Sequence, residues 1–361
     1  MNRLNFDGPI NSLSLGNVSY NFLREIRKKN IDINLFPAGN NADLTAFDKA
    51  PIEFKDWIKL TGYKRLKEFS REIPTLKVWH INESERKLGD KQFLYTFYEV
   101  DQPTQEEINI VKSQEHVFFS CSEAADIFKQ NGCDNVSYVP LGFDEDFHLT
   151  NKKYLSDDII HFGLIGKFER RKNTQAIIRL WLKKFGNNPK YQLTCLVNNV
   201  FFSESVMKDA INSCLDNKIY NNINFLPVLK TNSEVNELIN AIDIDLSGLS
   251  NGEGWNLPSF NASALGKWSI VSNCSSHKDW ATPDNSILVE PIGKQPCYDN
   301  IFFVEGRPFN QGNYYKLHSD IISDAMDKAV TVAKTINQKG LELQKQFTYE
   351  KSLNQILNFI L

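Results

Sequence analysis

The sequence predicts an α/β fold with two consecutive halves, each built on a parallel β-sheet. Short β-branched or aromatic runs alternate with longer helical patterns along the chain, which is typical of parallel sheets with crossover helices. The 361 residues suffice for two domains of ordinary size. A polar stretch at residues 149–158 separates the two series. We therefore expect one domain over residues 1–150 and another over 151–344, with a C-terminal helix at about 345–361.

The first half alternates strand patterns with helical patterns. A helix is expected from about Leu15 to Lys29, and Ser122 is expected to cap another that runs to about Asn131. Strands are expected at residues 32–36, 76–81, 93–97, 116–120 and 136–139.

The second half repeats this alternation and ends in a helical tail. Strands are expected at residues 159–165, 192–197, 223–226, 244–247, 269–271 and 287–289, with helices at 174–185, 204–216, 233–241 and from Pro258. The tail predicts one helix from His318 to Gln338 and a last helix that Thr348 caps, with an apolar stripe along it.

The composition is that of a globular enzyme. A hydrophobic content of 41% and a net charge of −3 exclude the strong basic excess that nucleic-acid binding usually needs. No apolar run approaches the roughly 20 residues that span a bilayer, and the N-terminus lacks the apolar core of a signal peptide. The six cysteines form no C-x-x-C pair, so neither a zinc site nor a disulfide framework is expected. We expect a cytoplasmic protein.

The run Glu253-Gly254-Trp255-Asn256-Leu257-Pro258 places a carboxylate on a glycine turn directly before a helix. Proline suits the first helical position, where its missing N–H costs nothing. The amides of Trp255, Asn256 and Leu257 should then point outward at the positive end of the helix dipole, which favours an anion. A neighbouring carboxylate accepts hydrogen bonds from hydroxyls, so the turn suits a ligand that is part phosphate and part sugar.

A second segment, residues 166–174, gathers four cations between a strand and a helix start. The helix dipole disfavours cations at that end, so a bound diphosphate explains them better than stability does. Lys167 and Lys172 are the main candidates, and Arg170 or Arg171 can supplement the charge. The alternative is a solvated basic turn.

Together these segments resemble the signatures of retaining GT-B glycosyltransferases of family 4, the glycosyl transferases group 1. The matching patterns are E-G-[FW]-x-L-P, followed by A-x-x-x-G, and G-[RK]-x-x-x-x-K. The likeness spans roughly Leu13 to Val289 and departs at Asn261, where the family usually has a second glutamate. It implies two Rossmann-like domains that face a cleft, with the terminal helix crossing back to the first.

The resemblance also implies roles for individual residues. Glu253, His80 and Lys172 would be catalytic: Glu253 orients the sugar, and His80 faces it from a strand end. A structural, hydrogen-bonded histidine is the alternative for His80. The implied donor-binding set is Gly16, Lys167, Lys172, Val228, Gly254, Trp255, Asn256, Leu257 and Asn261.

Glu99 and Asp101 end a strand pattern at the expected cleft, and we assign them to the acceptor side. Paired carboxylates also suit glycosidases. A helix start follows at residues 103–107, so a capping role is the stronger alternative for Asp101.

The predicted reaction is metal-independent transfer of a hexose from a nucleotide sugar, such as a UDP- or GDP-hexose, to a glycan, lipid or protein hydroxyl. No cofactor or metal is expected. The alternatives are a degenerate domain that serves as a binding or scaffold subunit, and an epimerase or phosphorylase on the same fold, although no phosphorylase cofactor-lysine motif is present. Basic clusters at residues 24–29 and 55–67 suggest weak peripheral membrane contact, but a solvated face is the favoured interpretation.

Overall fold

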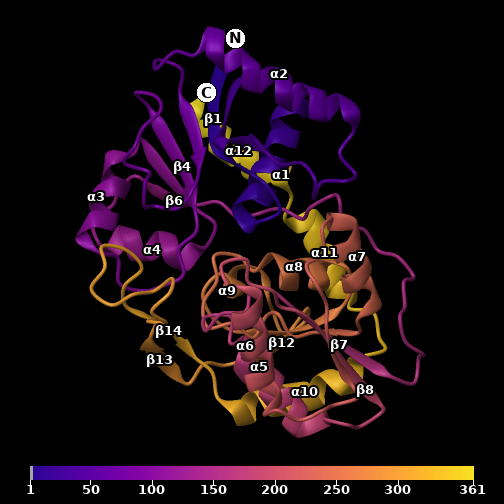
Figure 1. Ribbon diagram of the computed structural model, residues 1–361. Coiled ribbons are helices and arrows are strands. Elements are labelled where there is room, and N and C mark those ends of the chain that lie inside the picture. Colours follow the sequence, from indigo (N-terminus) through magenta and orange to yellow (C-terminus); the bar gives the residue numbers. More distant parts are fainter. Residues whose placement is uncertain (1–2) are drawn as a thin grey trace.

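The computed structural model describes residues 3–361 and contains two parallel six-stranded sheets, one in each half of the chain (Figure 1). The first sheet has the order β2-β1-β3-β4-β5-β6. Its strands are β1 (Arg3–Ile10), β2 (Asp32–Ala42), β3 (Thr75–Val78), β4 (Gln92–Thr96), β5 (His116–Phe119) and β6 (Val136–Tyr138). The helices of this half are α1 (Ser14–Lys28), α2 (Ile52–Glu68), α3 (Gln105–Ser113) and α4 (Ser122–Gln130).

The second sheet has the order β12-β11-β10-β7-β8-β9. Its strands are β7 (Ile160–Ile165), β8 (Tyr191–Leu196), β9 (Ile223–Phe225), β10 (Ile244–Asp245), β11 (Trp268–Ser272) and β12 (Ile287–Val289). The helices are α5 (Thr174–Phe185), α6 (Glu204–Leu215), α7 (Asn232–Ala241), α8 (Leu257–Ala264) and α9 (His277–Trp280). This alternation of parallel strands and helices confirms the predicted α/β class.

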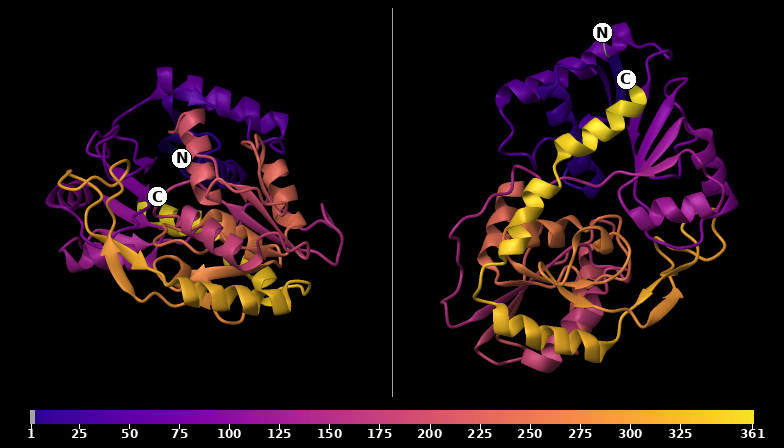
Figure 2. Two further views of the ribbon diagram at one scale, coloured as in Figure 1. Left: turned by 60° about the horizontal axis from the view of Figure 1, so that its bottom comes forward. Right: turned by 180° about the vertical axis from the view of Figure 1, so that it is seen from behind.

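Three helices close the chain: α10 (Ser319–Val332), α11 (Gln338–Gln346) and α12 (Tyr349–Ile360). The chain crosses back from the second half at α11, and α12 lies on the first half (Figure 2). The ring of Tyr349 packs edge-on against Phe22 of α1 at 5.6 Å, and the amide of Phe143 donates to the carbonyl of Phe347. The predicted return of the terminal helix is therefore confirmed.

A hairpin of β13 (Gly293–Pro296) and β14 (Asn313–Lys316), with the loop between them, leaves the second half and reaches the first near α3 and α4 (Figure 1). We call residues 291–317 the strap. Its Cys297, Phe303 and Tyr314 are buried in one apolar cluster with residues of the first half such as Tyr98 and Phe128. No strand pattern in the sequence predicted this element.

Several expected boundaries were wrong. The helix expected from His318 to Gln338 ends at Val332, because the buried Asn337 caps a new helix by accepting a hydrogen bond from the amide of Gly340. Ser122 does not cap α4, because the N-cap of this helix is Cys121. The hydroxyl and the amide of Ser122 instead donate to the carboxylate of Asp279.

The first strand, β1, was missed although it lies inside the first sheet. Its Asn5 interrupts the apolar pattern, yet the side chain is buried and donates to the carbonyls of Ser70 and Ile73. All six cysteines are buried and free. None of the helices within residues 3–361 is long and apolar enough to cross a membrane.

Candidate functional site

The Glu253 turn lies where the two halves touch. Two glycines flank Glu253, and at both of them the first half of the chain comes too close for a side chain. A Cβ at Gly254 would lie 2.8 Å from the side chain of Phe97, and one at Gly252 would lie 2.7 Å from the carbonyl oxygen of Glu99. The hydroxyl of Ser120 also donates to the carbonyl of Gly254 at 2.7 Å. The turn is therefore positioned by both halves of the molecule.

Glu253 belongs to a group of paired charges that we call the cleft cluster. Its members are Glu99, Lys167, Glu169, Arg171, Lys172 and Glu253. Arg171 lies at the centre, with guanidinium nitrogens 3.1 Å from the carboxylate of Glu253 and 2.7 Å from that of Glu169. A third carboxylate, that of Glu99, is 3.9 Å from Arg171. From the sequence, Arg171 was predicted only as a supplement to the two lysines.

Two carboxylates of the cleft cluster, those of Glu253 and Glu169, stay ionised although they are buried. Burial alone would raise the pKa of Glu253, but Arg171 and Lys172 outweigh it and lower that pKa to about 2. The pKa of Glu169 is lowered in the same way: burial opposes the shift, and the charges of Arg171 and Lys167 produce it. Around neutral pH, Glu253 is therefore a charged acceptor of hydrogen bonds and not an acid.

The two predicted phosphate lysines have different surroundings. The ammonium of Lys172 is 2.6 Å from Glu253. The ammonium of Lys167 is 3.3 Å from Glu169 and 4.5 Å from the ring centroid of Phe302 in the strap. Both lysines thus belong to the cleft cluster, but only Lys172 contacts Glu253 directly.

Next to the cleft cluster lies a cavity of about 270 Å³, the cleft cavity, which both halves line. Its charged or polar lining includes His80, Glu99, Lys167, Glu169 and Arg171, and its aromatic lining includes Phe97, Phe201, Phe302 and Phe309. The volume approaches the lower range of small-molecule sites. The structure therefore brings His80 and Glu99 to the same cavity as Lys167.

His80 lies on the wall of the cleft cavity, where its side chain remains accessible to solvent. The protein that surrounds the cavity nevertheless desolvates the ring and lowers its pKa below 6.5. Glu99 opposes this shift, while Lys167 and Arg171 add to it. A neutral imidazole is therefore the form present around neutral pH.

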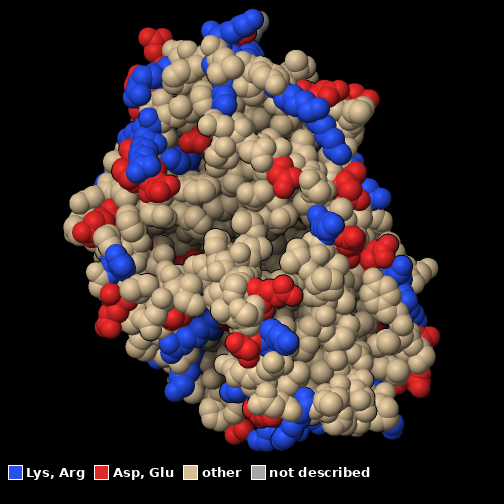
Figure 3. Space-filling view, in the orientation of Figure 1, with Lys and Arg blue, Asp and Glu red and all other residues tan. Residues whose placement is uncertain are grey.

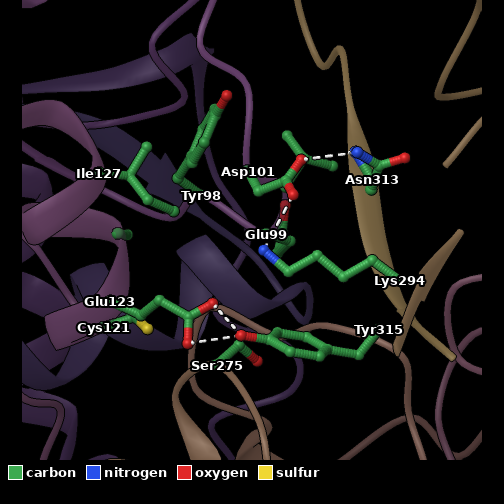
Figure 4. A pocket seen from close by; sticks show the side chains of 12 residues that line it. Tyr98, Glu99, Asp101, Cys121, Glu123, Ile127, Ser275, Lys294, Asn313 and Tyr315 are labelled. Carbon is green, nitrogen blue, oxygen red and sulfur yellow. Dashed lines mark hydrogen bonds and ion pairs between the residues drawn. The ribbon is translucent and has the colours of Figure 1, made fainter. Parts of the chain in front are cut away.

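Asp101 does not cap α3. That cap is Thr104, which forms a capping box with Glu107. Asp101 instead holds the strap: its carboxylate accepts from the amide of Asn313 at 2.7 Å and pairs with Lys294 at 2.9 Å (Figure 4).

Figure 4 also shows the hydroxyl of Tyr315 pointing at the carboxylate of Glu123, to which it donates at 2.9 Å. The space among these side chains measures only about 10 Å³, roughly the room for one water. These contacts therefore attach the strap to the first half and leave no room for a ligand between them.

The helix start after Glu253 depends on an unusual backbone conformation. Asn256 is the N-cap of α8, with φ 69° and ψ 67°, the left-handed region that asparagine tolerates better than most residues. Its side-chain amide donates to the carbonyl of Ser247 at 2.8 Å and to Nε2 of His277 at 3.0 Å. Burial lowers the pKa of His277 to about 4, against the charge of Glu253, so its Nε2 is free to accept. Sequence reasoning missed His277, which no motif marks.

The other predicted donor residues lie around α8 or farther along the halves. The Trp255 side chain is buried against Phe260 and Phe347, so any donor contact there would come from its backbone. Asn261 lies within α8 and is 5% exposed, and its amide oxygen has no hydrogen-bond partner within residues 3–361. Leu257, the first residue of α8, is partly buried.

Gly16 and Val228 lie on separate segments. Gly16 is buried in the first turn of α1, where a Cβ would lie 2.3 Å from the carbonyl oxygen of Asn11. Val228 is exposed on the loop after β9. Within residues 3–361, no group of three or more His, Cys, Asp or Glu side chains is arranged to hold a metal ion.

The two parallel sheets, the cleft cavity between the halves and the returning α12 define the GT-B class of fold. No protein-family model matches the chain, and no curated protein matches it by sequence. Solved glycosyltransferase structures do match it along nearly their whole length. This confirms the resemblance suggested by the motifs at the level of the fold.

One match is a sucrose-phosphate synthase (tll1590) from Thermosynechococcus elongatus, with a TM-score of 0.70, 11% identity and coverage of 99% of this chain and 98% of the other. Another is Anabaena Alr3699/HepE in complex with UDP and glucose, with a TM-score of 0.65, 11% identity and coverage of 99% and 98%. The lipopolysaccharide outer core galactosyltransferase WaaB matches with a TM-score of 0.61, 12% identity and the same coverage. At these identities the likeness is one of fold.

Proposed function

We propose that this protein is a glycosyltransferase that moves a hexose from a nucleoside-diphosphate sugar to a hydroxyl acceptor, with retention of anomeric configuration. The observation that carries the proposal is the ionised Glu253, paired with Lys172 and Arg171 directly before α8. A carboxylate for sugar hydroxyls and cations for a diphosphate thus meet at one helix start, on a GT-B fold.

The diphosphate would bind by exchanging partners with Lys172. Within the cleft cluster, three cations (Lys167, Arg171, Lys172) face three carboxylates (Glu99, Glu169, Glu253), so no positive charge is in excess. An arriving diphosphate would draw Lys172 from Glu253. That exchange frees the Glu253 carboxylate to accept hydrogen bonds from the sugar, while Arg171 keeps it ionised.

The proposed transfer proceeds on one face of the sugar. The bond from the anomeric carbon to the diphosphate breaks, the bond to the acceptor oxygen forms, and the acceptor proton passes to the departing phosphate oxygen. Negative charge grows on the leaving diphosphate, where Lys172 and the start of α8 would stabilise it. This arrangement requires no metal. His80 would contribute from the cavity wall as a neutral hydrogen-bonding group.

Asn261 supports a ribose contact on the donor side. Its buried amide oxygen lacks a partner, and an unsatisfied buried acceptor is costly unless a ligand or water completes it. A ribose hydroxyl would supply the missing donor. Since Alr3699/HepE is solved with UDP and glucose, UDP-glucose is the first donor to test.

The acceptor would occupy the cleft cavity. Phe201, Phe302 and Phe309 provide flat apolar faces, and Glu99 provides a carboxylate that is 21% exposed. Such a lining fits the apolar face and the hydroxyls of a sugar ring. Because Asp101 fastens the strap, its contribution to acceptor binding would be indirect.

The test is release of nucleoside diphosphate from a panel of sugar nucleotides, with and without simple glycoside acceptors, in excess chelator. Lys172→Ala should weaken nucleoside-diphosphate binding by roughly 1.5–3 kcal/mol, the value of a charge-assisted hydrogen bond. Lys183→Ala, an exposed lysine on α5, is the matched control. Glu253→Gln should depress turnover while diphosphate binding persists.

Activity that vanishes with chelator and returns with magnesium or manganese would contradict the metal-independent mechanism. The replacement of the usual glutamate by Asn261 keeps a second candidate open, a binding subunit that has lost catalysis. Wild-type protein that binds a nucleoside diphosphate but releases none from any donor would favour that candidate.

A further inference from the structure

The outer face of α2 carries large apolar side chains that nothing in the chain covers within residues 3–361. Leu60 is 67% exposed, Tyr63 72% and Leu66 74%, and Phe69 follows directly after the helix. The three helical residues are spaced three apart, so they share one face. Phe54, Ile58 and Thr61 form the buried face of the same helix. We call Lys59–Phe69 the α2 patch.

Cations surround these apolar residues. The α2 patch contains Lys59, Lys64, Arg65 and Lys67 against one carboxylate, Glu68. Lys59 pairs with Asp56 at 3.6 Å, and Lys64 pairs with Asp32 and Glu68. Within residues 3–361, Arg65 and Lys67 have no ion pair. Figure 3 shows basic side chains along the upper edge of the molecule, over α2, with acidic side chains beside them at the right end of this edge. The acidic residue Glu53 lies in the first turn of α2, before the patch.

We propose that the α2 patch docks on an anionic phospholipid surface. Leucine and tyrosine side chains enter the headgroup region of a bilayer, while lysine and arginine reach the lipid phosphates; together these two signals give a reversible peripheral contact. α2 lies on the first half, at the end of the molecule away from the second half (Figure 1), so docking leaves the cleft cavity uncovered. The proposal does not depend on the proposed transferase activity.

The test is sedimentation of the full-length protein with two kinds of vesicle: phosphatidylcholine alone, and equal parts of phosphatidylcholine and phosphatidylglycerol. Wild-type protein should sediment with the anionic vesicles at low salt and lose binding as salt rises. The double variant Leu60→Ser/Leu66→Ser and the double variant Lys59→Glu/Lys67→Glu should each reduce partitioning by roughly tenfold or more.

The matched control is Val206→Ser/Ile219→Ser, which removes two exposed apolar side chains from the second half. It should sediment like wild type. Because all six positions are exposed, circular dichroism and thermal midpoints should stay unchanged. Wild-type protein that remains in the supernatant with anionic vesicles at low salt would overturn the proposal. So would a wild-type dimer that Leu60→Ser/Leu66→Ser dissociates, since the patch would then be a contact between copies of the chain.

Discussion

Two buried charge clusters in this molecule use the same residue types with opposite results. In the cleft cluster, Arg171 and two lysines balance three carboxylates, and the pKa of Glu253 falls to about 2. A second cluster, the crossover cluster, lies between α1 and the segment that leads to the second half. There burial and the neighbouring Asp146 raise the pKa of Asp144 to about 6, although Arg24 and Asn21 oppose the shift.

The difference follows from the balance of charge around each carboxyl group. Glu253 contacts two cations, at 2.6 and 3.1 Å. Asp144 shares the single guanidinium of Arg24, at 3.3 Å, with Asp146. A buried carboxylate with ample cations stays ionised to low pH and can exchange partners with a ligand, whereas one with too few cations keeps its proton up to a higher pH. This contrast favours a ligand-binding role for the cleft cluster and a structural role for the crossover cluster.

The largest expected effect is that of removing the central cation of the cleft cluster. Arg171→Met should lower the free energy of unfolding by about 3–5 kcal/mol, because it leaves buried carboxylates without their partner. Arg24→Met should cost less, about 1.5–3 kcal/mol, since Asp144 can take up a proton instead. Urea denaturation near neutral pH measures both.

Arg71→Met is the control for these substitutions, because the Arg71–Asp90 pair is exposed on both sides and should be worth about 0–1 kcal/mol. If Arg171→Met costs no more than this control, the cleft cluster is not held by its central arginine.

Patterns of apolar residues and caps predicted most of the fold. The α5 boundaries, Thr174 to Phe185, agree with the expectation, and Thr348 does cap α12. The misses have physical causes outside such patterns. Buried asparagines formed long-range hydrogen bonds in β1 and before α11, as Asn337 does with the carbonyls of Lys267 and Asn285. The strap depends on contacts between distant residues, such as Asp101 with Lys294.

For the site, sequence motifs located Glu253 and Lys172 but not the network between them. The run Glu169-Arg170-Arg171-Lys172 contained the signal, yet only the fold shows that Arg171 turns inward while Arg170 donates to the carbonyl of Tyr298. Helix and strand periodicity carries no information about such pairing across 80 or more residues. The individual roles of the predicted donor and acceptor residues stay predictions.

The two clusters should also respond oppositely to pH. The pKa of Glu253 is lowered from 4.5, so its contribution to stability is present above about pH 4.5 and is lost as pH falls toward about 2. The pKa of Asp144 is raised from 3.8, so the folded protein holds that proton more tightly, and stability falls as pH rises from about 4 to 6. Each effect should amount to about 3 kcal/mol.

Urea denaturation across this pH range, with Glu253→Gln and Asp144→Asn beside wild type, separates the two contributions. Glu253→Gln should remove the pH dependence of the unfolding free energy only between about pH 2 and 4.5. Asp144→Asn should remove it only between about pH 4 and 6. An Asp144→Asn curve parallel to that of wild type would contradict the unbalanced charge assigned to the crossover cluster.

The smallest effect concerns how the cleft cluster depends on contact between the halves. Gly254→Ala places a Cβ 2.8 Å from Phe97, so the turn or the ring must shift, which should cost about 1–3 kcal/mol of unfolding free energy. Gly62→Ala is the matched control: a Cβ there meets nothing within 4 Å inside α2, so alanine should stabilise the helix by about 0.5–1 kcal/mol. Because the crossover cluster lies away from this turn, Gly254→Ala should leave the pH dependence of stability assigned to Asp144 unchanged. It should shift the pH range over which the contribution of Glu253 to stability is lost. If Gly254→Ala has wild-type stability and loses the Glu253 contribution over the same pH range as wild type, the cleft cluster forms without the close approach of Phe97.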